Sequence, residues 1–143
     1  MTRTPVSILL VEDNVADVFF VREALRFEGI ETELFVAPDG EKAVEFIESA
    51  EISRDAPCPQ IILLDLNLPR RSGAEVLLRI NQSSRLAKVP VVIVTSSDAP
   101  SDRAEMARLG ARRYFVKPRD LDEYLKLGVL VKDVLREQRT RQE

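Results

Sequence analysis

The sequence predicts an α/β fold in which helices cover both faces of a doubly wound, five-stranded parallel sheet. Strand and helix patterns alternate five times along the 143 residues, which is typical of parallel strands joined by crossover helices. Three expected strands, at residues 7–11, 61–65 and 91–94, are largely aliphatic. Strands of this kind are buried on both faces, so we place these three in the middle of the sheet.

The two remaining strands are expected at the edges. Residues 32–37 mix polar with apolar side chains, and residues 114–116 form only a short run. Right-handed crossovers then favour the strand order 2-1-3-4-5, one of the two common doubly wound orders. Ligands bind beyond the carboxyl ends of such strands where the order reverses. The expected site therefore lies between the first and third strands.

Apolar residues at helical spacing predict a helix after each strand. The first helix should span 15–28, with a broad apolar face of Phe19, Phe20, Ala24, Leu25 and Phe27, and a loop should cover 49–60. A last helix, at 120–138, carries apolar residues around roughly two-thirds of its circumference at ~100° per residue. One buried face needs less than this, so we expect part of the excess to face a partner. Residues 136–143 are expected to fray.

Composition and charge narrow the function classes. The length suits a single domain over residues 1–143, with no output domain. A net charge of −3 gives no basis for nucleic-acid binding, and no apolar run approaches the ~18 residues of a membrane span. A single cysteine, Cys58, is expected to be an exposed loop thiol, as in a cytoplasmic protein. The absence of histidine excludes a Ser-His-Asp or Cys-His site within the chain.

Polar side chains follow the strands around the expected switch point. Glu12 and Asp13 follow the first strand, and Asp65 follows the third. Like charges this close raise each other's pKa unless a cation joins them, and oxygen ligands suit a hard cation such as Mg²⁺. Thr95 ends the fourth strand and Lys117 follows the fifth. Acids, a hydroxyl, an ammonium and Mg²⁺ are the parts that phosphoryl transfer onto an aspartate requires.

Four segments carry a family resemblance: ILLVEDN at 8–14, IILLDLNLPRRSG at 61–73, VIVTSS at 92–97 and YFVKP at 114–118. In this order and spacing, they resemble the receiver domain of two-component response regulators. The VEDN-x-AD opening and the extended carboxyl-terminal end resemble the stand-alone receivers that partner bacterial phytochromes. The resemblance implies a flavodoxin-like receiver fold and a phosphorelay protein that signals after phosphorylation of an aspartate.

The resemblance also implies which residues accept the phosphoryl group and hold the metal. Asp65 is expected to be the phospho-acceptor. Asp13 and Asp65 are expected to bind Mg²⁺ through their carboxylates, and Asn67 through its backbone carbonyl. Glu12 is expected to act through a metal-bound water. Because many receivers have an aspartate at that position, the longer glutamate leaves direct coordination open.

Further roles are implied at the ends of the fourth and fifth strands. Thr95 is expected to hydrogen-bond the phosphoryl group, and Lys117 to pair with Asp65 or its phosphate. Tyr114 is expected to be a switch aromatic that rotates inward when Thr95 moves. The bond between Lys117 and Pro118 is expected to be cis, which the small trans preference before proline allows.

Without a histidine of its own, the chain needs a phosphoryl donor in trans. The expected donor is a sensor histidine kinase, with a bacteriophytochrome as the specific expectation. The output is then a contact with a downstream protein or a phosphotransfer protein. We also expect a homodimer through the fourth helix, the fifth strand and the last helix. The chain is not expected to be an enzyme beyond its own phosphorylation and slow self-dephosphorylation.

Other interpretations stay open at this stage. A haloacid-dehalogenase-like phosphatase also uses Mg²⁺ and a strand-end aspartate, but it needs a second aspartate where Asn67 stands. An inactive pseudo-receiver conflicts with the complete acid set and Lys117. Taken singly, Asn14 or Asp17 fits a helix cap, and Gly73 fits a turn.

Overall fold

The computed structural model describes residues 4–142 and contains one five-stranded sheet, in the order β2-β1-β3-β4-β5. All neighbouring strands are parallel. Both the predicted fold class and the predicted strand order are confirmed. The strands are β1 (Val6–Val11), β2 (Thr32–Ala37), β3 (Ile61–Leu64), β4 (Val91–Thr95) and β5 (Arg113–Val116).

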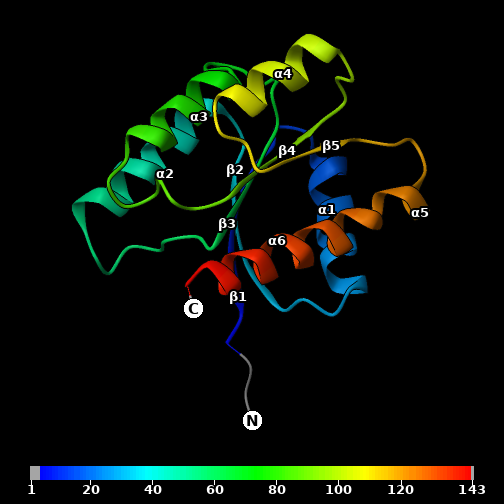
Figure 1. Cartoon of the computed structure of the whole chain (residues 1–143), viewed down its shortest axis with the longest axis horizontal. Helices are drawn as coiled ribbons and strands as arrows, with labels where there is room; N and C mark the ends of the chain where they lie inside the picture. The colour runs from blue at the N-terminus through cyan, green and yellow to red at the C-terminus, as the bar shows by residue number, and fades with distance from the viewer. Residues whose placement is uncertain (1–3, 143) are drawn as a thin grey trace.

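Helices cover both faces of the sheet (Figure 1). The sheet separates two apolar clusters because alternate side chains of a strand point to opposite faces. Along β1, Leu9 packs with one cluster and Ile8 with the other. One face carries α2 (Gly40–Ile52), α3 (Gly73–Gln82) and α4 (Pro100–Arg108), and the other carries α1 (Val15–Phe27), α5 (Leu121–Tyr124) and α6 (Lys126–Gln142).

Short polar side chains cap the starts of α1, α2 and α3. Asn14 accepts the backbone N–H of Asp17 at 3.1 Å at the start of α1. Asp39 and Ser72 cap α2 and α3 in the same way. Each cap satisfies an N–H that has no partner within the helix. The predicted cap role is therefore confirmed for Asn14, whereas the Asp17 side chain points to other partners, described below.

The buried face of α1 agrees only in part with the one predicted, because Ala24 and Leu25 are buried as expected but two of the phenylalanines are not. Val21, Ala24 and Leu25 are fully buried, at the spacing of one helical face. Phe19 and Phe27 are 54% and 69% exposed, so the prediction that they face the core was wrong. The face that packs closely against α6 is instead the one that carries Ala24. A Cβ atom on Gly128 would lie only 2.4 Å from the carbonyl oxygen of Ala24, which leaves room for small side chains there.

The single last helix predicted at 120–138 is divided in the structure. A turn at Leu125 separates α5 from α6, and the Gly128 N–H donates to the Leu125 carbonyl at 3.1 Å. This bond spans three residues, as in a 3₁₀ turn. α6 continues to Gln142, so residues 136–142 are helical where fraying was expected, and residue 143 lies outside the described residues. α2 also reaches Ile52, four residues into the loop predicted at 49–60.

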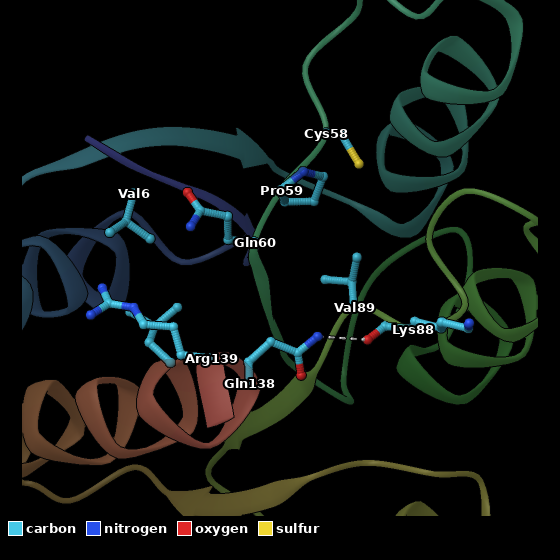
Figure 2. Close-up of a pocket in the computed structure, with 9 residues that line it drawn as sticks. Val6, Cys58, Pro59, Gln60, Lys88, Val89, Gln138 and Arg139 are labelled. Atoms are coloured by element: carbon cyan, nitrogen blue, oxygen red, sulfur yellow. Dashed lines mark hydrogen bonds between the residues drawn. The ribbon is translucent and has the colours of Figure 1, made fainter. Parts of the chain in front are cut away.

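A cavity of about 370 Å³ opens at the amino ends of the strands, opposite the rim where the predicted site residues gather (Figure 2). Cys58 lines it and packs, half-buried, against one of the apolar clusters. The prediction of an exposed thiol was therefore wrong, because the loop before β3 folds back onto the core. Gln138 Nε2 donates to the Lys88 carbonyl at 3.4 Å beside this cavity. No helix within residues 4–142 has both the length and the apolar character to cross a membrane.

Candidate functional site

Carboxylates from three segments meet one ammonium at the carboxyl ends of the strands. Lys117, just after β5, places Nζ 2.7 Å from Glu12 Oε1, 2.9 Å from Asp65 Oδ2 and 3.0 Å from Asp17 Oδ2. The Lys117 side chain is only 10% exposed. The ammonium donates hydrogen bonds to Asp65 and Asp17, and Glu12 Oε1 lies in ion-pair contact with it. The parallel strands bring Glu12, Asp65 and Lys117 together as predicted.

The acidic triad, defined as Glu12, Asp13 and Asp65, has the composition of a metal site. Each residue offers a carboxylate oxygen, and the three oxygens lie within 4.8 Å of one another. Glu12 and Asp65 are 2% and 6% exposed, whereas Asp13 faces solvent, where an ion can enter. A set of oxygen donors alone fits a hard divalent cation.

The balance of charge shifts two pKa values in the site. Burial raises the pKa of Glu12 to about 7; the hydrogen bond from Lys117 opposes this rise, and the charge of Asp65 adds to it. Burial alone would lower the pKa of Lys117, but its hydrogen bonds to Glu12, Asp65 and Asp17 together raise it. The Lys117 ammonium is thus charged at neutral pH. Glu12, in contrast, takes up a proton more easily than an ordinary glutamate when no second cation is present.

The Asp65 carboxylate is held in one orientation. Its Oδ1 accepts the N–H of Leu66 at 2.7 Å and that of Asn67 at 3.4 Å, and its Oδ2 accepts from Lys117. Gly73 lies against this segment, because a Cβ atom there would come within 2.4 Å of the Asp65 carbonyl oxygen. Gly73 is the first residue of α3, so its role is close packing and the turn interpretation was wrong.

The predicted switch residues both contact Ser97. Thr95 is fully buried at the end of β4, and its Oγ1 accepts the Ser97 N–H at 3.4 Å. The Tyr114 hydroxyl donates to the Ser97 carbonyl at 2.8 Å. The Arg103 guanidinium lies 4.6 Å from the centre of the Tyr114 ring. A movement of Thr95 can therefore reach Tyr114 through one loop residue.

The peptide bond between Lys117 and Pro118 is trans, since no cis bond occurs in the part of the chain that the structure describes. The expectation of a cis bond was wrong for this structure. Trans is the more stable isomer even before proline. The Lys117 N–H donates to the Thr95 carbonyl at 2.8 Å, which extends the pairing of β5 and directs the side chain toward Asp65 without a cis bond.

Two residues of the site were missed from the sequence, Asp17 and Tyr124. The Tyr124 hydroxyl donates to Asp17 Oδ1 at 3.2 Å, while Asp17 Oδ2 contacts Lys117. Tyr124 is 2% exposed, and its ring lies 5.4 Å from that of Phe20 and 5.9 Å from that of Phe115. Burial and the charge of Asp17 raise the pKa of Tyr124. One sequence signal was available, because Asp17 is the last residue of the VEDN-x-AD segment that carries the family resemblance.

The fold and this site define a class of protein. Residues 8–127 match the response regulator receiver domain, and the chain belongs to this family. The matched region includes the 2-1-3-4-5 sheet and the aspartate, threonine and lysine that lie at its strand ends.

Its relatives include other response regulators, one of which is a phytochrome response regulator. Response regulator Rcp1 of Synechocystis sp. is 39% identical over 123 residues, which are 86% of this chain and 84% of Rcp1. The crystal structure of the Mn²⁺-bound form of Rcp1 superposes with a TM-score of 0.77, covering 87% of this chain and 89% of that one. The phosphorylated cyanobacterial phytochrome response regulator RcpA is 31% identical, with a TM-score of 0.81 over 91% of this chain and 93% of RcpA. The chain is thus a receiver-domain response regulator similar to these proteins.

Proposed function

We propose that this response regulator accepts a phosphoryl group on Asp65 from a sensor histidine kinase, with Mg²⁺ as cofactor. The observation that carries the proposal is the setting of the Asp65 carboxylate. Two backbone N–H groups hold one of its oxygens, and Lys117 holds the other at 2.9 Å, beside the acidic triad. A carboxylate fixed in this way next to a cation site is oriented for nucleophilic attack on phosphorus.

The donor is a phosphohistidine of another protein, because this chain has no histidine. One Asp65 oxygen forms the new P–O bond while the P–N bond to the donor imidazole breaks in line, and the imidazole keeps the electron pair of that bond. Lys117 offers its positive charge to the phosphoryl oxygens. Mg²⁺, held by Asp13, Asp65 and the Asn67 carbonyl and supported by Glu12, would neutralise phosphoryl charge.

Phosphorylation changes the conformation of the protein outside the site through Thr95 and Tyr114. The phosphoryl group adds about −1.5 to −2 charge and strong acceptor oxygens. The Thr95 hydroxyl can donate to one of them. This donation moves the Ser97 segment, to which the Tyr114 hydroxyl is bonded at 2.8 Å. Phosphorylation then shifts the population between two positions of Tyr114, and a downstream or phosphotransfer protein recognises the difference.

We further propose a cytoplasmic homodimer through α4, β5 and the α5–α6 segment, with a bacteriophytochrome as the kinase. β5 is an edge strand, which leaves its outer side available for pairing. Leu121 and Val129 are 43% and 47% exposed on the last two helices, consistent with an apolar excess that a partner covers. Light scattering checks this directly, and a monomer both with and without phosphorylation refutes the dimer.

Labelling with acetyl phosphate and Mg²⁺ tests the main proposal. Asp65→Asn should abolish incorporation of phosphate, whereas Asp133→Asn, on the exposed side of α6, should leave it unchanged. Full labelling of the Asp65 variant would refute the assignment. A turnover assay on small phosphate esters separates this function from a phosphatase: we expect only slow hydrolysis of the protein's own acyl phosphate. A pseudo-receiver would give no labelling at all.

A further inference from the structure

We propose that Asp17 is a positioning residue for the phosphorylation reaction: oriented by Tyr124, it holds the Lys117 ammonium at Asp65. This inference rests on the proposed function of Asp65. It assigns a role to two residues that lie outside the acidic triad and that carry no part of the mechanism above.

Asp17 differs from the other carboxylates that contact Lys117. Glu12 and Asp65 belong to the acidic triad, so a bound cation and a phosphoryl group change what these two side chains can offer the ammonium. Asp17 lies outside that triad, on α1, and its Oδ2 is 3.0 Å from Lys117 Nζ. One N–H of Lys117 can therefore keep its partner through each stage of the reaction.

Both the backbone and the side chain of Asp17 have hydrogen-bond partners. Its backbone N–H donates to the Asn14 side chain at 3.1 Å, which fixes the residue in the first turn of α1. Its Oδ1 accepts from the Tyr124 hydroxyl at 3.2 Å. The Tyr124 ring is 2% exposed and packs between Phe20 and Phe115. The position of this carboxylate is thus set by the core of the molecule.

Such an anchor is useful because lysine is flexible. A four-carbon stem lets the ammonium take many positions in the absence of fixed partners. An ammonium held in place before the reaction needs no reorganisation when charge develops on the phosphoryl oxygens. Because one N–H of the Lys117 ammonium donates to Asp17, its two other N–H groups remain for Asp65 and the incoming phosphoryl group. The chain from Tyr124 through Asp17 to Lys117 then acts as a rigid support for the transfer.

Nuclear magnetic resonance of the lysine ammonium groups tests the contact itself. In the metal-free protein, Lys117 should give a slowly exchanging ammonium signal, assigned by its absence in Lys117→Arg. Asp17→Asn should abolish or broaden this signal, and Tyr124→Phe should weaken it. Asp133→Asn is the matched control and should leave it unchanged. An unaltered signal in Asp17→Asn overturns the proposal, and the amide spectrum shows whether each variant is folded.

The kinetic test uses acetyl phosphate at saturating Mg²⁺. Asp17→Asn should lower the maximal phosphorylation rate about 3- to 10-fold, the effect of one weakened hydrogen bond. It should not weaken donor binding, because removing a negative charge eases the approach of an anion. Tyr124→Phe should lower the same rate less. It should have no further effect in an Asp17→Asn background, since Tyr124 acts through Asp17.

Two outcomes contradict this inference while leaving the proposed function intact. One is a maximal rate for Asp17→Asn equal to that of Asp133→Asn. The other is additive loss in the Asp17→Asn, Tyr124→Phe double variant, as expected if each residue only supports the fold. Failure of the unmodified protein to be labelled would instead refute the phosphorylation of Asp65. The ammonium signal would still report on the contact between Asp17 and Lys117.

Discussion

Lys117 is the residue on which the charge balance of the site depends. Among the described residues, it supplies the one ammonium in salt-bridge contact with Glu12, Asp17 and Asp65. These carboxylates are largely removed from water, and a buried charge without a partner is costly. The charge of this side chain therefore compensates the buried carboxylates, and its role in phosphorylation is the one proposed above.

Lys117→Met should lower the free energy of unfolding by about 3 kcal/mol at pH 8 in the absence of metal, because it leaves several carboxylates without a cation. The loss should shrink at pH 5, where Glu12 can take up a proton. Urea denaturation at both pH values measures this. Lys126→Met removes an exposed lysine that pairs with Glu123 one turn away, and it should change stability by less than about 0.5 kcal/mol. Equal losses in the two variants would contradict the central role of Lys117.

Glu12 should make the metal-free protein less stable as the pH rises. Its pKa is raised to about 7 in the folded state from an ordinary value of 4.5. Between these values, the folded state keeps a proton that the unfolded state has lost, so stability falls as the pH rises through this window. Comparison with Glu12→Gln isolates the effect: denaturation in EDTA should show the glutamine variant gaining stability relative to the parent from pH 4.5 to 7. A constant difference across that range would show that the pKa is not raised.

At the scale of elements, two glycines allow close packing, and one of them, Gly73, lies against the site. Gly73 brings the start of α3 against the Asp65 backbone, and Gly128 brings α6 against Ala24 of α1. Neither glycine has a positive φ angle. Each is therefore required for lack of space and not for backbone conformation.

Gly73→Ala and Gly128→Ala should both destabilise the protein, by about 1–3 kcal/mol each, because a methyl group is forced into a filled space. Only Gly73→Ala should also slow phosphorylation of the folded protein, since the displaced atoms belong to Asp65 and Leu66. Urea denaturation and acetyl phosphate labelling measure the two effects. Slowing of similar size in Gly128→Ala would mean that general loosening, and not displacement of Asp65, is the cause.

The elements also show where sequence patterns suffice. The strand order followed from which strands are aliphatic, because burial on both faces leaves little choice of residue. The acidic triad followed from its place at strand ends, which parallel pairing brings to one rim. The division of the last helix could not be predicted, since apolar residues continue through the turn at Leu125. The contact between Asp17 and Tyr124 was missed because the two residues lie 107 positions apart, and no local pattern reports so distant a contact.

For the whole molecule, the acidic triad should couple metal binding to stability. A ligand that binds only the folded state stabilises it by about 2.7 kcal/mol at 100 times its dissociation constant. Mg²⁺ should therefore raise the thermal unfolding temperature at constant ionic strength. The increase should be lost in Asp13→Asn and kept in Asp133→Asn. An equal increase in both variants would point to general screening of charge instead of a site.

The wide sequence separation between Lys117 and the acids of the site affects how the chain folds during synthesis. Lys117 lies 52 positions after Asp65 and 100 after Asp17. As a ribosome delivers the chain from its amino end, every acid of the site emerges long before its ammonium. The growing chain holds mutually repelling carboxylates and an unpaired edge on β4 until β5 arrives. The last strand then completes the sheet and the charge balance in one step, so a nascent or truncated chain should not take up phosphate before its sheet is complete.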